Sequence, residues 1–223
     1  MNVFDRQTKI SQRNRAVGQQ DFQKYSYLKE EVGFRVFDRL CDVKRTFQSA
    51  LDLGCGLGHV SKHITSAQQL VTDKIYMLDP SKSVLEAAEK PPDVPCELMD
   101  FDEECLSEIP IDSGSLDLVF SNLSLHWVND LPGMFRQVLR LLRNDGVFIG
   151  SLFGTDTLYE LRVSLQLAEH ELMGKSVRDV ISPALTQSDA DLCQHEFILA
   201  SKTHRTHFLG NRRKYFLNIF ILK

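Results

Sequence analysis

The stretch Leu51-Asp52-Leu53-Gly54-Cys55-Gly56-Leu57-Gly58-His59-Val60 decides the fold of this 223-residue chain. Its apolar start and alternating glycines are typical of a buried strand that ends in a tight turn before a helix. Glycine reaches backbone angles closed to other residues and has no side chain to keep a ligand from the main chain. The helix expected over 60–66 would add unpaired N–H groups and a positive dipole end. The stretch therefore predicts a loop that binds a nucleotide-like ligand.

The spacing of the glycines narrows the class of ligand. A dinucleotide-binding G-x-G-x-x-G would place glycine at position 59, where His59 stands, and no G-K-[ST] of a phosphate-binding loop follows. The pattern D-x-G-x-G-x-G resembles the first motif of the S-adenosylmethionine-dependent methyltransferase fold. A glycine-rich turn without a ligand is the alternative interpretation of so short a motif.

Composition and charge exclude several functional classes. The net charge is −4 and 43% of the residues are hydrophobic, which fits one α/β domain. No apolar run is long enough to cross a bilayer. The five cysteines form neither a C-x-x-C pair nor a zinc-binding spacing, so we expect no metal and a reducing compartment. The acidic region over 50–201 argues against bound nucleic acid, because phosphates need a basic footprint.

Strands and helices alternate along the chain. We expect strands at 49–53, 74–79, 95–99, 115–121 and 147–153. We expect helices at 21–41 (one or two), 60–66, 80–89, 131–143 and 155–173, and interpret 1–20 as a solvated lead-in. This order predicts an α/β fold with a doubly wound, mostly parallel sheet and right-handed crossovers. In such sheets ligands lie beyond the carboxyl ends of the strands, where strand order reverses.

Several candidate ligand-binding residues follow the expected strands. Asp79 is placed to accept hydrogen bonds from ribose hydroxyls, or alternatively to cap the helix ahead of Ser81. Asp100 could accept from an adenine amino group, although 102–104 are rival acids and a solvated acidic turn is the other interpretation. Asp52 could hold an ammonium group or, as a buried carboxylate, accept a structural hydrogen bond. The predicted cofactor-binding set is Asp52, Gly54, Cys55, Gly56, Gly58, Asp79, Asp100 and Ser121.

The run Phe120-Ser121-Asn122-Leu123-Ser124-Leu125-His126-Trp127-Val128 supplies the candidate catalytic residues. Trp127, the only tryptophan, could stack on an adenine or line the substrate entrance, or simply pack the sheet against a helix. His126 could act as a base or bond to the local backbone. Asn122 completes the candidates. In-line methyl transfer from an activated sulfonium needs mainly positioning, so the lack of a nucleophile–base pair does not count against it.

Longer runs carry a closer resemblance. The runs are Asn2 to Arg6, Tyr27 to Gly33, Leu51 to Gly58, Leu123 to Pro132, and Gly146 to Gly150 through Asp156 to Arg162. Together they resemble a family of mitochondrial assembly factors for respiratory complex I, up to about Pro183. That family has the methyltransferase fold and is regarded as hydroxylating an arginine of a complex I subunit.

The resemblance implies a cofactor, a partner and a location. The implied cofactor is S-adenosylmethionine and the implied protein substrate is a complex I subunit. The implied place is the mitochondrial matrix side of the inner membrane, compatible with peripheral membrane association and without a transmembrane segment. The family carries an N-terminal transit peptide, and we expect this chain to start about where the mature protein would.

The chain departs from the family near Ala184. We expect an N-terminal helical extension over 1–48, a methyltransferase-like domain over 49–183, and a divergent basic tail over 184–223 that is a candidate for disorder. The last strands of the sheet would then be missing, and the strand at 147–153 would be an open edge.

Two alternatives to arginine hydroxylation stay open. One is a methyltransferase acting on a small molecule or a protein. The other is a non-catalytic assembly chaperone that holds a client through its first helix and the helix at 155–173. No H-x-D pattern for an iron site is present, so hydroxylation enters only through the resemblance.

Overall fold

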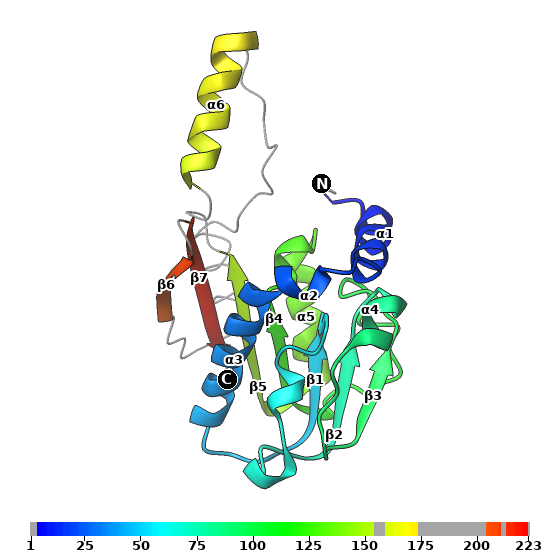
Figure 1. The fold of residues 1–223 in the computed structure, drawn as a ribbon. Coiled ribbons are helices and arrows are strands. Elements are labelled where there is room, and N and C mark those ends of the chain that lie inside the picture. Colours follow the sequence, from blue (N-terminus) through cyan, green and yellow to red (C-terminus); the bar gives the residue numbers. More distant parts are fainter. Residues whose placement is uncertain (1–3, 154–158, 174–203, 211–212, 223) are drawn as a thin grey trace.

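Seven strands form one sheet in the computed structural model, which describes residues 4–153, 159–173, 204–210 and 213–222. The order across the sheet is β3-β2-β1-β4-β5-β7-β6 (Figure 1). The strands are β1 Phe47–Leu53, β2 Val71–Leu78, β3 Cys96–Met99, β4 Leu116–Asn122, β5 Leu142–Phe153, β6 His204–Gly210 and β7 Arg213–Leu222. The first five run parallel, and the strand order reverses between β1 and β4.

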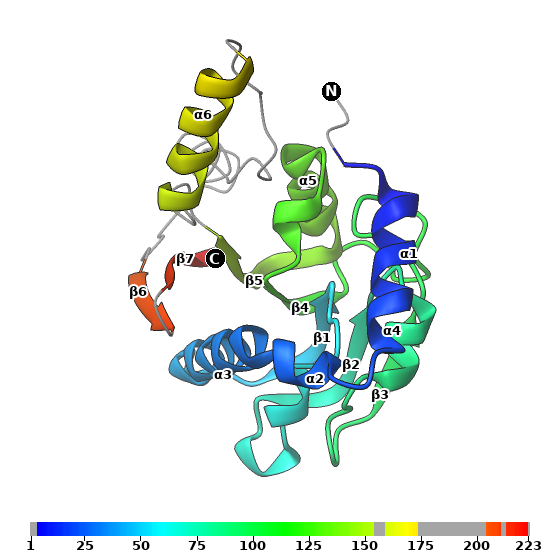
Figure 2. The ribbon, with the colours of Figure 1, turned by 45° about the horizontal axis from the view of Figure 1, so that its top comes forward.

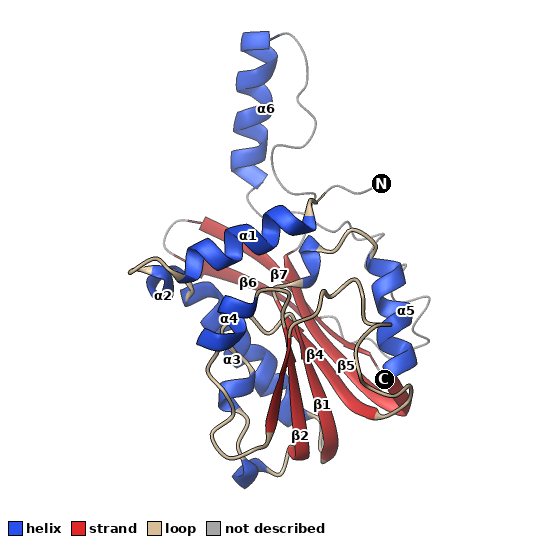
Figure 3. Cartoon of the chain, turned by 90° about the vertical axis from the view of Figure 1, so that its right-hand side faces the viewer, coloured by secondary structure: helices blue, strands red, loops and turns tan. Residues whose placement is uncertain are grey.

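Helices cover both faces of the sheet, as Figure 3 shows for α3 and α5. The helices are α1 Arg6–Val17, α2 Phe22–Tyr25, α3 Tyr27–Asp42, α4 Lys82–Ala87, α5 Leu131–Leu141 and α6 Tyr159–Met173. The apolar side of α3, centred on Val36, packs with one cluster of buried residues. The apolar side of α5, centred on Val138, packs with a second cluster. All seven residues of β4 between these clusters are buried, as their continuous apolar character predicts.

The predicted α/β class is confirmed, and the five expected parallel strands form close to their predicted bounds. The expected helix at 21–41 forms as α2 and α3, and α4 and α5 lie inside their predicted ranges. The expected helix at 155–173 forms as α6, while residues 155–158 lie outside the described residues. The domain bounds at residues 48 and 183 stay a prediction.

The prediction of a helix directly after the glycine loop is wrong. Residues 60–66 contain only a short 3-10 turn, η1 Ser61–His63, before a second one, η2 Ser66–Gln68. Serine and β-branched residues dominate this segment, and both types disfavour a long α-helix. The Ser61 hydroxyl also donates to Asp52 Oδ2 at 2.5 Å, so it is committed to the end of the sheet.

The expectation that the last strands are missing is also wrong. Strand β7 pairs antiparallel with β5, with Gly150 opposite Phe220, and β6 pairs antiparallel with β7. The sequence of β7 is rich in aromatic and β-branched residues, which favour strands. An open β5 edge offers unpaired N–H and C=O groups, and β7 satisfies them. The resemblance to the family ended too early to reveal this local pattern.

The residues interpreted as a lead-in form helix α1, none of whose residues is fully buried. Asp5 caps α1 by accepting hydrogen bonds from the N–H groups of Gln7 and Thr8. Figure 2 shows α1 running beside α4 above the carboxyl ends of the strands. In contrast, α6 projects away from the sheet (Figure 1). None of the helices that the structure describes combines the length and apolar character needed to span a bilayer.

Candidate active site

The glycine loop that follows β1 has the predicted left-handed backbone. The φ angles are +69° at Gly54, +56° at Gly56 and +76° at Gly58. A Cβ at Gly54 would collide with Ser124, and one at Gly58 would collide with the carbonyl of Glu89. A Cβ at Gly56 would meet nothing closer than 4.0 Å. Two glycines are therefore required for packing, while the main chain of Gly56 faces open space and can be approached by a ligand.

Asp79 directly follows β2 and binds the glycine loop. Its Oδ2 accepts the Gly56 N–H at 3.2 Å, and its Oδ1 accepts the Ser81 N–H at 2.9 Å. The helix cap of α4 is Ser81, whose hydroxyl accepts from the N–H of Val84. Burial raises the pKa of Asp79, and the guanidinium of Arg13, 3.0–3.1 Å from both carboxylate oxygens, opposes that rise. The cap interpretation therefore belongs to Ser81, and Asp79 holds the loop.

Asp52 in β1 carries a buried oxygen without a partner. Its Oδ2 accepts from Ser61, but its Oδ1 has no hydrogen-bond partner among the described residues. Burial raises the pKa of this carboxyl to about 7, and the nearby Asp79 carboxylate adds to the rise. A buried acceptor of this kind is costly unless a cationic or hydrogen-bonding group satisfies it.

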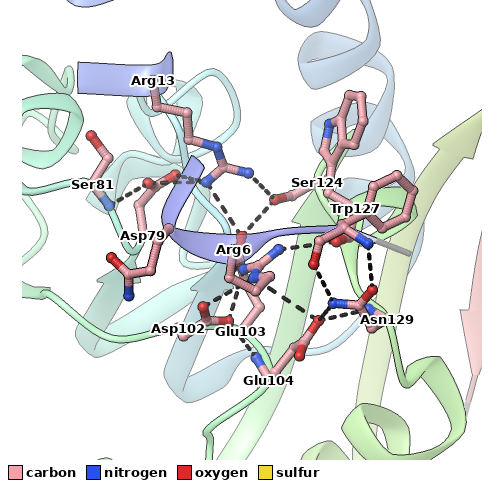
Figure 4. Close-up of polar contacts among 12 residues, drawn as sticks. Arg6, Arg13, Asp79, Ser81, Asp102, Glu103, Glu104, Ser124, Trp127 and Asn129 are labelled. Carbon is pink, nitrogen blue, oxygen red and sulfur yellow. Dashed lines mark hydrogen bonds and ion pairs between the residues drawn. The ribbon is translucent and has the colours of Figure 1, made fainter. Parts of the chain in front are cut away.

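The acidic segment after β3 contributes Asp102 and Glu103 to the polar cluster beside the glycine loop. Asp100 is exposed. Glu103 is fully buried, and its Oε1 accepts from the Ser124 hydroxyl at 2.8 Å. Asp102 and Glu103 both accept hydrogen bonds from the guanidinium of Arg6 (Figure 4). The rival acids at 102–104 thus bind the N-terminal segment and Ser124, whereas Asp100 is exposed and its contact with an adenine stays a prediction.

Basic residues of α1 reach this acidic site. Arg6, Lys9 and Arg13 follow a spacing of three and four residues, so they share one face of the helix. Arg13 contacts Asp79, Glu103 and Ser124, and Lys9 lies 3.5 Å from the centre of the Trp127 ring. Figure 4 shows Arg6 and Arg13 converging on the acidic residues from α1. The N-terminal helix is therefore part of the site.

Three of the predicted site residues make structural contacts. The Asn122 amide donates to the Lys29 carbonyl at 2.9 Å and accepts from the Ser151 hydroxyl at 3.0 Å. The Ser121 hydroxyl donates to the carbonyl of Leu53 at 2.7 Å. The Cys55 thiol is buried, and burial raises its pKa. These contacts set the shape of the loop and of the end of β4.

His126 and Trp127 lie on the 3-10 turn η3 Leu125–Trp127, beside the site. His126 is buried with Nδ1 unpartnered among the described residues, and its ring packs on Trp127 and Phe153. Burial lowers the pKa of His126 to about 3, and nearby Lys29 contributes. An imidazole of that pKa is a weak base. Trp127 is half-buried and packs against Phe4 at 5.3 Å, so its ring contacts the N-terminal segment.

Lys29 was missed in the sequence analysis. Its side chain is exposed to solvent, while the protein surrounding it lowers the pKa of its ammonium, and Arg13 lowers that pKa further. The charges of Asp79 and Glu103 act in the opposite direction. Within the described residues no group of His, Cys, Asp and Glu is arranged to hold a metal ion.

This fold is that of the S-adenosylmethionine-dependent methyltransferases. Residues 51–150 match the family model of a methyltransferase domain. Among solved structures, the plantazolicin methyltransferase BpumL in complex with SAH aligns with a TM-score of 0.61 at 16% identity, over 97% of this chain and 98% of that one. An arsenic(III) S-adenosylmethionine methyltransferase from Chlamydomonas reinhardtii aligns with a TM-score of 0.55 at 16% identity, over 78% and 63%.

Closer relatives are named as arginine hydroxylases. "Arginine-hydroxylase NDUFAF5, mitochondrial" of Danio rerio is 49% identical over 174 residues, which is 78% of this chain and 52% of the relative. The Homo sapiens protein of that name is 45% identical, over 78% and 48%. A malonyl-[acyl-carrier protein] O-methyltransferase of Methylovorus is 33% identical, over 61% and 47%. The chain spans about half the length of these relatives, and the matches confirm the resemblance inferred from the sequence.

Proposed function

We propose that this chain binds S-adenosylmethionine at the carboxyl ends of β1 and β2, and that it takes part in modifying an arginine of a respiratory complex I subunit. The cofactor assignment is carried by one observation, the hydrogen bond from Gly56 to Asp79 across a loop whose central glycine faces open space. The arginine assignment is carried by the relatives at 45–49% identity that are named arginine hydroxylases.

The residues present fit the proposed cofactor. The main chain at Gly56 would accept close approach of the ligand, and Asp79 would bind the ribose hydroxyls. The unpartnered Oδ1 of Asp52 would be satisfied by the ammonium group of the methionine portion. Gly54, Gly58, Cys55 and Ser121 would hold the loop in shape. Asp100, which is exposed after β3, stays the acid proposed for the adenine side, while Asp102 and Glu103 bind Arg6.

Arg13 must move for the ribose to bind Asp79, because its guanidinium lies 3.0–3.1 Å from both carboxylate oxygens. The Arg13 side chain is 21% exposed, so it can turn toward solvent without the sheet changing. The proposed role of α1 is therefore to cover Asp79 until a ligand displaces Arg13.

The proposed reaction inserts oxygen into a C–H bond of an arginine side chain. With dioxygen as the oxidant and a reduced nicotinamide as the external two-electron donor, one oxygen atom enters the C–OH group, and the other leaves as water with two protons taken up from the nicotinamide hydride and the solvent. When bound, S-adenosylmethionine supplies an activated methyl group on a sulfonium centre. The described residues would position the arginine and shield it. Mitochondrial location is proposed from the names of the relatives, and the matrix side with peripheral membrane contact is proposed from the family resemblance of the sequence.

Calorimetric titration with S-adenosylhomocysteine tests the cofactor assignment. Gly56→Arg should abolish heat of binding, because the arginine fills the open space and strains a residue at φ +56°. Gly114→Arg is the matched control, since Gly114 also has positive φ but lies against nothing within 4 Å. Equal binding by wild type and Gly56→Arg would refute a ligand site at this loop.

Methyl transfer is the second candidate, because the matched family model and the fold are those of methyltransferases. Mass spectrometry of a complex I client protein, incubated in air with the protein, S-adenosylmethionine and the reduced nicotinamide, separates the two. Gain of one oxygen atom on arginine supports hydroxylation, and gain of one methyl group supports transfer. An unmodified client in both cases, with intact cofactor binding, would favour the non-catalytic assembly role.

A further inference from the structure

The N-terminal segment binds the acidic site in the manner of a peptide ligand. Phe4 precedes α1, and Asp5 has an extended backbone with φ −76° and ψ 106°. The Phe4 N–H donates to Asn129 Oδ1 at 2.7 Å, and Asn129 Nδ2 donates to the Phe4 carbonyl at 3.0 Å. One side-chain amide therefore satisfies both main-chain groups of one residue, which a peptide of any sequence can offer.

Asn129 is held in place by contacts other than those with Phe4. Its own N–H donates to Glu104 Oε1 at 2.6 Å, and its Nδ2 donates to the same oxygen at 3.1 Å. The Trp127 ring lies next to it and meets the Phe4 ring edge to face, with centroids 5.3 Å apart. The main-chain contact and the aromatic contact are thus made by rigid neighbours on one segment, outside the acidic cluster.

All three nitrogens of the Arg6 guanidinium donate hydrogen bonds. Nε and Nη2 donate to the two oxygens of Asp102 at 3.0 and 2.7 Å, in the bidentate geometry that arginine alone provides. Nη2 also donates to Glu103, and Nη1 donates to the Trp127 carbonyl at 3.0 Å. The Arg6 side chain is only 14% exposed. The pattern selects a guanidinium over an ammonium, since an ammonium has no planar fork.

We propose that Asp102, Glu103, Trp127 and Asn129 form a recognition site for an extended peptide with an aromatic residue two positions before an arginine. Phe4 to Arg6 occupies this site as an internal ligand that a client peptide displaces. The inference deepens the proposed function and rests on it for the nature of the client, an arginine-bearing protein. The contacts that define the site are independent of the cofactor.

The internal ligand should compete strongly, because a tethered segment acts at an effective concentration of about millimolar. The test uses the probe acetyl-Phe-Asp-Arg-amide, with citrulline in place of arginine as the neutral control. Binding is followed by calorimetry and by the emission of Trp127, the only tryptophan in the chain. The proteins are wild type, a double variant with Phe4→Ala and Arg6→Gln, and Arg15→Gln as an exposed control on the same helix.

The double variant should bind the arginine probe about tenfold or more tightly than wild type, since the tethered competitor is removed. Arg15→Gln should match wild type, and the citrulline probe should bind to none of the proteins. Adding Glu103→Gln to the double variant should abolish probe binding. A double variant that keeps its fold and S-adenosylhomocysteine binding, yet does not bind the arginine probe or binds citrulline equally, overturns the inference and leaves a structural anchor.

A second measurement covers the case in which the double variant does not fold. A probe with benzoylphenylalanine in place of phenylalanine is photo-crosslinked to wild type, and the attachment point is mapped by mass spectrometry. Attachment within 127–129 that excess unlabelled probe suppresses supports the site, and attachment elsewhere or none overturns it. Peptide binding without S-adenosylhomocysteine binding would instead sink the cofactor assignment and spare this inference.

Discussion

Helix α1 and strand β7 are both attached to the parallel part of the molecule, but by different contacts. Helix α1 is held over the site mainly by charged side chains, with Arg6 on Asp102 and Arg13 on Asp79. Strand β7 is held along β5 by main-chain pairing, from Phe148 opposite Leu222 to Phe153 opposite Leu217. Charge contacts depend on particular residues and on salt, while main-chain pairing does not. The helix is therefore suited to exchange with a ligand, and the strand is suited to completing the sheet.

A proline in β7 should have the largest effect. Phe220→Pro places a proline opposite Gly150 in the pairing between β7 and β5, where the ring and the missing N–H should lower the free energy of unfolding by more than about 3 kcal/mol. Urea unfolding followed by circular dichroism measures this. Phe220→Val, which keeps the donor and favours a strand, is the control. Unchanged stability of the proline variant would show that β7 is not part of the cooperative sheet.

Glu103→Gln should have the second-largest effect, and it should weaken the attachment of helix α1. It removes a buried carboxylate that binds Arg6 and Arg13, and breaking a buried ion pair in this way costs about 3 kcal/mol. Trypsin should then cut within α1 sooner, while the sheet stays folded. The exposed Glu108→Gln serves as control. Equal cleavage rates for both variants would contradict the charge-based attachment of α1.

A change of pH should have the third-largest effect. It acts on Asp52 in strand β1 rather than on α1 or β7. The pKa of Asp52 is raised from an ordinary 3.8 to about 7 in the folded protein, so the folded state favours the protonated form. Its stabilising contribution is complete below about pH 4 and is lost as pH rises through 7, by about 2 kcal/mol between pH 5 and 7. Asp52→Asn should flatten this part of the pH profile of urea unfolding. A profile unchanged in the variant would assign the dependence to another group.

Salt should have the smallest effect. Raising it to about 1 M shortens the screening length to about 3 Å, which weakens the partly exposed pairs of α1. Amide hydrogen exchange in α1 should then become a few times faster, whereas exchange in β7 should not change. Faster exchange at both ends, or at neither, would remove the distinction drawn between them.

Much of the fold follows from local sequence patterns. The alternating glycines after Leu53 and the acid after Leu78 identified the loop and its partner, because strand ends in a parallel sheet meet at one edge. The helix after the loop failed, since Ser61 and its neighbours have low helix propensity. Strands β6 and β7 were not predicted, because the resemblance to the family ends before them. The strand-forming sequence of 213–222 is the local signal that indicates β7.

The role of α1 had no comparable local signal. Arg6 contacts residues about a hundred positions later in the chain, and no periodic pattern encodes such a pairing. The spacing of Arg6, Lys9 and Arg13 predicts a basic helix face, but not what it covers. The exposure of Asp100 and the burial of Glu103 had no local signal either, since only the path of the chain after β3 decides which acid turns inward.

The lysine beside the glycine loop has a practical consequence. Lys29 is exposed as a whole residue, and an amine whose pKa is lowered reacts with an activated ester more readily at neutral pH than one whose pKa is raised. Acylation of Lys29 under limiting reagent should therefore outrun that of Lys74, whose pKa is raised by its hydrogen bond to Glu97. Protection of this one amine would report occupancy of the site in crude mixtures, before any product has been identified.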